Sequence, residues 1–498
     1  MKQFVKKKMS FVMAMFIAMV TAISVLLPMT AFAQENYTLT LNNDGKTKHT
    51  FEIYQIFKGD LAGNVLSNIE WGSGIKEDSK AALGDASEKA KTLVSVSEAE
   101  KFANEIQNDL STTKKTQEVS ANSTARIDNL EAGYYLIKDS ASTQSGIENG
   151  AYTVYILKIV GNTEAKTKLD VPTVSKKVQE NSDKNWQDAA DYNIGDTIPY
   201  KLTGTLPTNY DKYEKYTYKF HDTMSKGLTF NQNSVKVTVD GVQLDESNYG
   251  VDIDVAENSF TVTFDDLKKI QNPVITANSN IVVEYTCELN ENAVIGANGN
   301  PNTVYLEYSN NPNQNGDGEY GTTPKDKNIV FTYKVVVNKK NENAQALKGA
   351  EFELYKKTDN GEEKIDRFTI QNIMDSNGST FTFKGLDAGT YVLKESKTPD
   401  GYNTIKPVEF TITAEYDKNA DDPRLNSLKA TTTNLGVLNF TINKEEGSLS
   451  SDVINNKGFT LPETGGMGRY LIYALGAIFV LAALGYVGYK KSRKHDVQ

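Results

Sequence analysis

Cysteine and histidine are almost absent from this chain of 498 residues, which has one Cys and three His. A single cysteine excludes disulfide bonds within the monomer. Cys287 follows the alternating segment 281–286, where a buried thiol acts as a small apolar residue. The sequence also lacks Cys/His metal spacing, a phosphate-binding glycine loop and a Gly-x-Ser-x-Gly elbow. We therefore expect no metal site, no cofactor and no enzyme activity.

Leucine-rich helical segments are also few, whereas the chain has 26 Tyr and 20 Phe. Aromatic residues are enriched in β-strands, so the composition favours all-β modules. At roughly 150 residues per domain, the length predicts about three of them. The formal net charge of −10 argues against binding to nucleic acid.

The first 33 residues have the composition of a secretory signal peptide. Lysines within the first eight residues precede an apolar segment at 11–27, and small residues follow at Ala31 and Ala33. This pattern predicts cleavage between Ala33 and Gln34, and an uncleaved membrane anchor is the alternative.

The C-terminal segment 461–498 contains an apolar run at 470–489, followed directly by basic residues. About 20 apolar residues span a membrane as one helix, and the basic residues stay in the cytoplasm. Taken alone, this helix could be an ordinary single-pass anchor. The preceding residues, Leu461, Pro462, Glu463, Thr464 and Gly465, resemble the cell-wall sorting signal. The resemblance implies that a sortase cleaves after Thr464 and transfers its acyl group to an amine.

Three modules are expected between these ends, at residues 34–170, 171–325 and 326–460. Strand-like alternation recurs in all three. The first module also contains a stretch rich in Ala, Glu and Lys at 79–110, which predicts a helical insertion.

The second and third modules each place charged and amide residues in phase with apolar ones. In the second, Lys176 alternates with Val174 and Val178, and Asp222 and Asn302 also share faces with apolar neighbours. The third repeats the order with Lys339, Glu395 and Asn455, which are likewise in phase with apolar residues.

A lysine buried in such a core becomes a neutral amine, because burial lowers its pKa. Beside an asparagine amide and a protonated carboxylic acid, it can form an isopeptide bond and release ammonia. The alternative is that these lysines extend to the surface and the acids form exposed ion pairs. A β-bulge would change the phase and substitute Lys177 for Lys176, or Asn456 for Asn455.

Several segments resemble Gram-positive backbone pilins. Residues 391–402 are similar to the pilin E-box, 347–355 to a prealbumin-like CnaB strand, and 171–178 with 302–312 to a fimbrial isopeptide-forming domain. The resemblance implies tandem immunoglobulin-like and prealbumin-like β-sandwiches. It also implies a Lys176–Asn302 bond assisted by Asp222 and a Lys339–Asn455 bond assisted by Glu395.

The first module lacks a convincing partner lysine, although Tyr135, Ile137 and Asp139 mimic the E-box strand. We expect no cross-link there.

Shaft subunits of this family also present a lysine to the sortase, usually in a Tyr-Pro-Lys motif that this chain lacks. At the matching place, Lys168 is the first candidate and Lys166 the second.

The expected function is the shaft subunit of a covalent pilus on a Gram-positive cell wall, supporting adhesion. The implied partners are a sortase, identical subunits, minor pilins, peptidoglycan and host surface ligands. The alternative is a single wall-anchored adhesin that is not polymerised.

Overall fold

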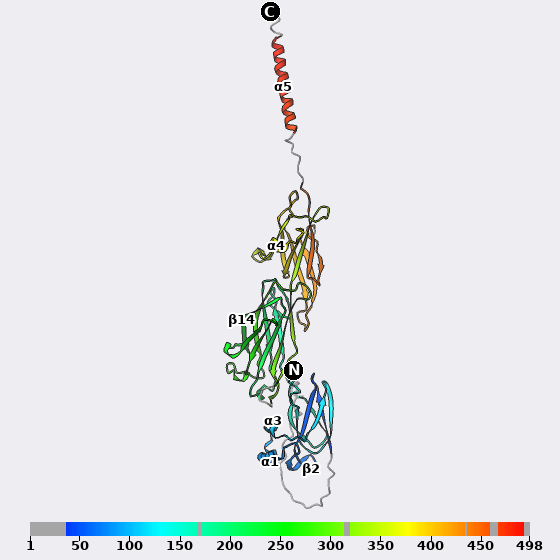
Figure 1. The fold of residues 1–498 in the computed structure, drawn as a ribbon, viewed down its shortest axis with the longest axis vertical. Coiled ribbons are helices and arrows are strands. Elements are labelled where there is room, and N and C mark those ends of the chain that lie inside the picture. The colour runs from blue at the N-terminus through cyan, green and yellow to red at the C-terminus, as the bar shows by residue number, and fades with distance from the viewer. Residues whose placement is uncertain (1–35, 168–170, 313–318, 434–435, 459–466, 493–498) are drawn as a thin grey trace, which may run out of the picture.

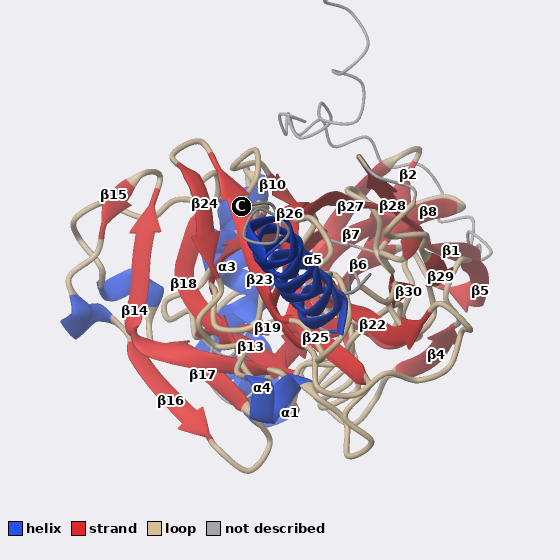
Figure 2. Ribbon diagram, turned by 90° about the horizontal axis from the view of Figure 1, so that it is seen from above, coloured by secondary structure: helices blue, strands red, loops and turns tan. Residues whose placement is uncertain are grey.

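The computed structural model describes residues 36–167, 171–312, 319–433, 436–458 and 467–492. They form a row of three β-domains along the long axis, with a separate helix at the C-terminal end (Figure 1). Strands far outnumber helices, as Figure 2 shows. The predicted all-β class with tandem sandwich modules and a C-terminal helix is confirmed.

The N-terminal domain packs a three-stranded sheet, ordered β5-β1-β8, against a sheet ordered β3-β2-β6-β7, in which β4 also pairs with β2. Alternation drives the packing, since Leu39 and Leu41 on β1 are buried while their neighbours are partly exposed. The strands are β1 Tyr37–Asn43, β2 His49–Ala62, β3 Val65–Trp71, β4 Lys115–Val119, β5 Ser123–Leu130, β6 Gly133–Asp139, β7 Val154–Ile159 and β8 Thr163–Lys166.

The expected helical insertion of this domain consists of short helices between β3 and β4. They are α1 Glu77–Leu83, α2 Ala86–Thr92, α3 Val96–Glu105 and the 3-10 helix η1 Ile106–Asp109. Ser95 and Glu98 form a capping box that begins α3. Buried Phe102 and Ile106 attach the insertion to the core beside β2.

The middle domain is a sandwich of a sheet ordered β10-β9-β12-β18-β14-β15 and a sheet ordered β11-β21-β19-β13-β17-β16, with β20 paired to β19. Its core is rich in fully buried tyrosines, including Tyr200, Tyr218 and Tyr285. The strands are β9 Val174–Gln179, β10 Trp186–Gln187, β11 Ala189–Asp191, β12 Thr197–Gly204, β13 Tyr218–Met224, β14 Leu228–Val239, β15 Val242–Gln243, β16 Gly250–Asp254, β17 Ser259–Phe264, β18 Ile281–Leu289, β19 Asn300–Ser309, β20 Tyr320–Thr322 and β21 Asp326–Phe331. Its 3-10 helices are η2 Tyr210–Lys212, η3 Glu246–Asn248 and η4 Leu267–Lys269.

The C-terminal domain packs a sheet ordered β25-β22-β30-β29 against one ordered β24-β23-β26-β27-β28. Its first and last long strands, β22 and β30, are parallel neighbours. The elements are β22 Tyr333–Asn341, β23 Glu351–Thr358, β24 Gly361–Lys364, α4 Ile370–Ile373, β25 Thr380–Leu386, β26 Gly389–Lys397, β27 Val408–Tyr416, β28 Leu425–Thr432, β29 Thr441–Asn443 and β30 Ser448–Asn455.

The chain passes from the middle to the C-terminal domain at Thr332. Strand β21, Asp326–Phe331, pairs with β19 and β11 and so belongs to the middle sheet. The sequence pattern placed these residues in the third module. The apolar run Ile329–Phe331 at the end of β21 leads almost directly into the alternating strand β22, so the hydrophobic pattern does not mark the boundary.

Backbone hydrogen bonds join adjacent domains. Between the first two domains, Gly146 N donates to Tyr320 O at 2.6 Å and Asn149 N donates to Thr322 O at 2.7 Å. Between the second and third, Ile194 N donates to Gly385 O at 3.0 Å. The domains are therefore connected by more than their linkers.

Candidate functional site: two buried clusters of lysine, acid and asparagine

The middle domain brings Lys176, Asp222 and Asn302 together between its two sheets. Lys176 projects from β9 in one sheet, whereas Asp222 on β13 and Asn302 on β19 come from the facing sheet. Strands β13 and β19 are antiparallel neighbours, and Asp222 and Asn302 lie diagonally across them, because Asp222 pairs with Val304 and Asn302 pairs with Met224. All three side chains are fully buried, with 0% exposure.

Tyr285, on β18, connects the three side chains. Lys176 Nζ donates to the Asp222 carboxylate and to Tyr285 Oη, the latter at 2.7 Å. Tyr285 Oη in turn donates to Asp222 Oδ2 at 2.8 Å, and Asn302 Nδ2 donates to Tyr285 Oη at 2.9 Å. The amine and the amide nitrogen thus share one hydroxyl.

Burial controls the protonation of this cluster. It lowers the pKa of Lys176, against the opposing effect of the Asp222 charge, and it raises the pKa of Asp222, against the effect of Lys176. Both shifts favour passing the proton from the amine to the carboxylate. The resulting neutral amine is a nucleophile, and the protonated acid can polarise the Asn302 amide.

The C-terminal domain contains a second cluster, formed by Lys339, Glu395 and Asn455. Their exposed fractions are 1%, 8% and 1%, respectively. Lys339 Nζ donates to Val453 O at 3.1 Å, on the strand that carries Asn455. Asn455 Nδ2 donates directly to Glu395 Oε1 at 2.8 Å, and Glu395 Oε2 accepts a bond from Ile405 N at 2.9 Å.

Burial lowers the pKa of Lys339 to about 8, although Glu395 acts in the opposite direction. About a tenth of this amine is therefore neutral at pH 7, far more than for an exposed lysine. The order along the chain is the same as in the middle domain: a lysine from the first strand, an acid from a middle strand and an asparagine from a later strand.

The two alternative residues lie outside these clusters. Lys177 is half-buried and pairs with Asp188 through a 2.6 Å contact between Nζ and Oδ1. Asn456 is exposed at the end of β30. The structure brings together the primary candidates, Lys176 and Asn455, with their partners.

The N-terminal domain places a different pair at its E-box-like strand. Asp139 on β6 contacts His49 on β2, with Oδ1 2.9 Å from Nδ1, and both side chains are fully buried. Asp139 Oδ2 also accepts a bond from Thr153 N at 2.8 Å. Sequence reasoning identified Asp139 but missed His49, whose phase with Phe51 and Ile53 was the available signal.

Cys287, the lone cysteine, is fully buried on β18 beside Met224, with the two sulfurs 3.4 Å apart. Burial raises the pKa of its thiol. The thiol therefore has little thiolate character and packs as an apolar residue.

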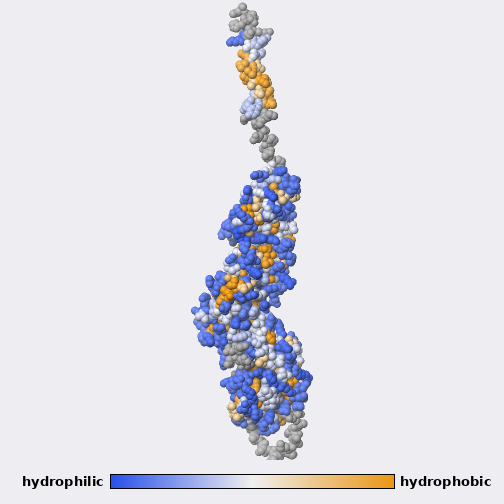
Figure 3. Space-filling model, viewed as in Figure 1, coloured by the Kyte–Doolittle hydropathy of each residue, from blue (hydrophilic) through white to orange (hydrophobic). Residues whose placement is uncertain are grey.

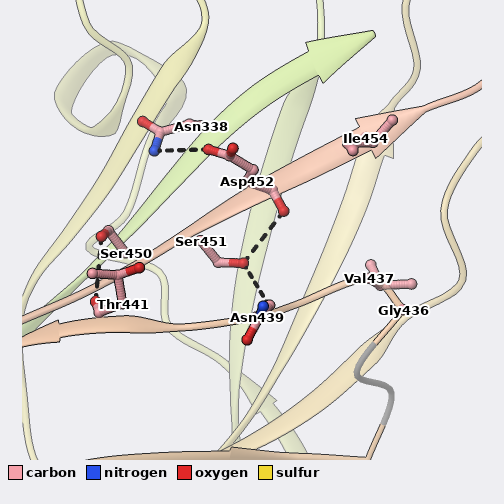
Figure 4. A pocket seen from close by; sticks show the side chains of 9 residues that line it. All are labelled: Asn338, Gly436, Val437, Asn439, Thr441, Ser450, Ser451, Asp452 and Ile454. Carbon is pink, nitrogen blue, oxygen red and sulfur yellow. Dashed lines mark hydrogen bonds between the residues drawn. The ribbon is translucent and has the colours of Figure 1, made fainter. Parts of the chain in front are cut away.

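A polar pocket of about 460 Å³ lies beside β30, the strand that carries Asn455 (Figure 4). Its lining combines small and polar residues, among them Thr441, Ser450 and Ser451. Asp452, its acid, accepts hydrogen bonds from Asn338 Nδ2 at 3.3 Å and Lys340 Nζ at 2.5 Å. These lining residues contain no nucleophile paired with a base.

Helix α5, Met467–Ser492, stands apart from the three domains (Figure 1). Its segment Tyr470–Lys491 has a mean hydropathy of 2.2 and no part buried against the protein, which suits a membrane span. Figure 3 shows this helix as an apolar segment beyond a largely hydrophilic body. The candidate sorting residues Leu461–Gly465 and the signal cleavage site at Ala33 and Gln34 lie outside the described residues.

The two candidate acceptor lysines lie at and just after the end of the N-terminal domain in the sequence. Lys166 ends β8 and has a side chain that is 73% exposed, with Nζ 2.9 Å from Asp44 Oδ2. Lys168 lies outside the described residues.

Three family models match successive parts of the chain. Residues 194–312 match the Cna-B-like domain of Gram-positive pilin backbone subunit 2, residues 333–424 match a prealbumin-like fold domain, and residues 454–497 match the LPXTG cell wall anchor motif. The first two fall within the domains that hold the lysine clusters, and Lys176 and Asn455 lie outside these two matches.

A curated relative is the trypsin-resistant surface T6 protein of Streptococcus pyogenes serotype M6. It is 28% identical over 349 residues, and the match covers 57% of this chain and 62% of that protein. The chain therefore matches a little less than two thirds of the relative's length.

Two solved structures share the fold. The T6 backbone pilin of serotype M6 S. pyogenes aligns with a TM-score of 0.56 and 19% identity, covering 86% of this chain and 100% of that one. The full-length major pilin SpaD from Corynebacterium diphtheriae aligns with a TM-score of 0.51 and 23% identity, covering 85% and 98%.

Proposed function

We propose that this chain, which carries the domain set of Gram-positive sortase-assembled major pilins, is the shaft subunit of a covalent pilus anchored to the cell wall. The observation that carries the proposal is the order of the three matches along one chain: a pilin backbone domain, a prealbumin-like domain and a wall anchor. In this function, a sortase joins Thr464 of one subunit to a lysine of the next. Minor pilins, peptidoglycan and host surface ligands are the further partners.

The role is structural rather than enzymatic. The acids Asp222 and Glu395 act once, on their own chain, to promote the Lys176–Asn302 and Lys339–Asn455 bonds. Burial of both lysines beside an acid and an asparagine supports these bonds. The bonds link β9 to β19 and β22 to β30, which are strands from early and late in each domain. Tension along the fibre would therefore pass through a covalent connection rather than through strand hydrogen bonds alone.

For the intermolecular bond, we propose Lys168 as the acceptor, with Lys166 as the second choice. Lys166 ends the last strand of the N-terminal domain, and Lys168 follows it in the sequence. The side chain of Lys166 is accessible, and its amine lies 2.9 Å from Asp44 Oδ2. A sortase needs an exposed amine in a segment that its active site can reach.

Immunoblots of cell-wall extracts test the shaft function. The wild-type chain should give a ladder of very large species, and Thr464→Ala should abolish it. Lys168→Ala should also abolish the ladder if Lys168 is the acceptor, whereas Lys166→Ala should do so if the second choice holds. Lys48→Ala, at an exposed lysine of the same domain, is the matched control and should leave the ladder intact. A single anchored band from the wild-type chain would instead support the unpolymerised adhesin.

A further inference from the structure

The two lysine clusters differ in how the acid reaches the asparagine. In the C-terminal domain, Glu395 Oε1 accepts a bond directly from Asn455 Nδ2 at 2.8 Å. In the middle domain the acid is aspartate, which is one methylene shorter. The hydrogen bonds of the Asp222 carboxylate come from Lys176 and Tyr285, and the bond of Asn302 Nδ2 goes to Tyr285. The phenol hydroxyl thus occupies the gap between acid and amide.

The Tyr285 ring is held so that its hydroxyl stays in this position. It stacks on Tyr200 with ring centroids 5.3 Å apart, and it makes edge contacts with Phe260 at 4.8 Å and Phe230 at 5.7 Å. The residue is 2% exposed, and the inward face of β18 also carries buried Val283 and Cys287. A ring packed on several sides can change its hydroxyl torsion but not its place.

We propose that Tyr285 is a catalytic residue of the Lys176–Asn302 cross-linking reaction and carries the proton from the attacking amine to the leaving ammonia. This inference rests on the proposed cross-link. The Nζ–Cγ bond forms, the Cγ–Nδ2 bond of Asn302 breaks, and Nδ2 leaves as ammonia. Tyr285 Oη receives the proton that Nζ loses and gives its own to Nδ2, so no oxidant or other reactant is needed.

The contacts favour a role in proton transfer over simple packing. A hydroxyl that only filled space would need one partner, whereas this one contacts both reacting nitrogens, at 2.7 Å and 2.9 Å, and the acid as well. Positioned proton transfer contributes about 10²- to 10⁴-fold to a rate. The C-terminal cluster has no need of such a hydroxyl, because Glu395 contacts the leaving nitrogen itself.

The experiment follows both internal bonds in one molecule. The full chain is synthesised in a cell-free reaction with detergent for α5, samples are taken over time, and the cross-linked peptides are quantified by mass spectrometry. Tyr285→Phe should slow the Lys176–Asn302 bond at least about tenfold. The Lys339–Asn455 bond of the same molecules should form at the wild-type rate.

Tyr216→Phe is the matched control, because it removes another fully buried hydroxyl from the same core, and its ring contacts Tyr210, Tyr213 and Tyr218. Both bonds should form normally in this variant. A wild-type rate for the Lys176–Asn302 bond in Tyr285→Phe would overturn the proposal. Absence of that bond from the wild-type chain would contradict the proposed cross-link itself, and with it this role.

A second variant separates proton transfer from packing and folding. Site-specific 3,5-difluorotyrosine at position 285 keeps the ring and hydroxyl but makes the hydroxyl more acidic. If the hydroxyl transfers the proton, the rate of bond formation should change by about twofold or more. An unchanged rate in this variant would leave Tyr285 with a packing role only and overturn the proposal.

Discussion

His49 and Asp139 form a fully buried pair in the N-terminal domain, with Nδ1 2.9 Å from Oδ1. The pair links β2 to β6, which are antiparallel neighbours. Asp139 lies on the strand that resembles the E-box, where the C-terminal domain carries Glu395. The first domain therefore has a noncovalent contact where the other two have a lysine, an acid and an asparagine.

Replacing Asp139 by Ala should destabilise the N-terminal domain by about 2–4 kcal/mol, because His49 and Thr153 N would lose a buried partner. Chemical unfolding and hydrogen exchange of β2 and β6 measure the loss. Glu118→Ala removes an exposed pair with Lys48 in the same domain and should change stability by less than about 1 kcal/mol. Equal effects of the two variants would contradict the buried pair's importance.

The C-terminal cross-link gives the second prediction. In Lys339→Ala, the measured mass should fall short of the mass calculated for its own sequence by one ammonia less than in wild type. The unfolding free energy should fall by about 4–5 kcal/mol, the loop-entropy value for a tie across roughly 100 residues. Lys340→Ala is the control, since it changes the next residue of β22, which only pairs with Asp452 at the surface. If Lys339→Ala and wild type showed the same deficit from their calculated masses and the same stability, the proposed bond would be absent.

Alternation identified the buried faces from sequence because a strand side chain has only two directions in which to point. Lys176, Asp222 and Asn302 were selected by phase alone, and the structure places all three in one core. The third domain followed the same rule with Lys339, Glu395 and Asn455. Periodicity could therefore indicate which residues point inward.

Periodicity could not indicate what an inward residue touches across the sandwich. Tyr285 alternates like any core aromatic, and its hydroxyl contacts depend on how two sheets stack. His49 went unrecognised for the same reason, since its partner lies on a strand far along the chain. The contacts between domains also have no sequence signal, because they join loops and strand ends.

A cluster of three buried acidic residues lies at the contact between the middle and C-terminal domains. Glu180, Asp191 and Asp387 are each at most 3% exposed. Tyr416 Oη donates to Glu180 Oε2 at 2.7 Å, and Lys356 Nζ lies 3.1 Å from Asp387 Oδ2. Lys356 pairs with Asp387, while the charges of Asp387 and Glu180 both act on Asp191. The ionisation of these carboxyl groups therefore bears on how firmly the domains hold together.

Burial raises the pKa of Asp387 to about 6, against the opposing charge of Lys356 and the hydrogen bond from Asn181. Between pH 4 and 6 the folded protein binds more protons at this residue than the unfolded chain does. Its contribution to stability is therefore greatest at low pH and falls by about 2 kcal/mol as pH rises toward 7. Asp387→Asn should remove this pH dependence. Its stability relative to wild type should therefore increase as the pH rises from 4 to 7.

Thermal unfolding of the two proteins from pH 4 to 7 measures this difference. Asp252→Asn, at an exposed acid of the middle domain, should leave the pH profile of wild type unchanged. A stability difference between Asp387→Asn and wild type that is constant with pH would show that Asp387 does not titrate in this range.

Gly385 gives the last prediction, on the stiffness of the same junction. Its backbone has φ +74°, and an added Cβ would lie 2.4 Å from side-chain atoms of Ile194 in the middle domain. Gly378 has nearly the same φ, +71°, but an added Cβ there meets only Met374 Sδ at 4.0 Å. Ala at either position costs about 1–2 kcal/mol of backbone strain. A difference between the two variants therefore reports the loss of the contact between the domains.

In Gly385→Ala, hydrogen-exchange protection should fall at Ile194 N, which donates to Gly385 O. Small-angle scattering should also show more bending between the domains. Gly378→Ala should show neither change. Identical behaviour of the two variants would mean that close packing at Gly385 does not hold the two domains in line.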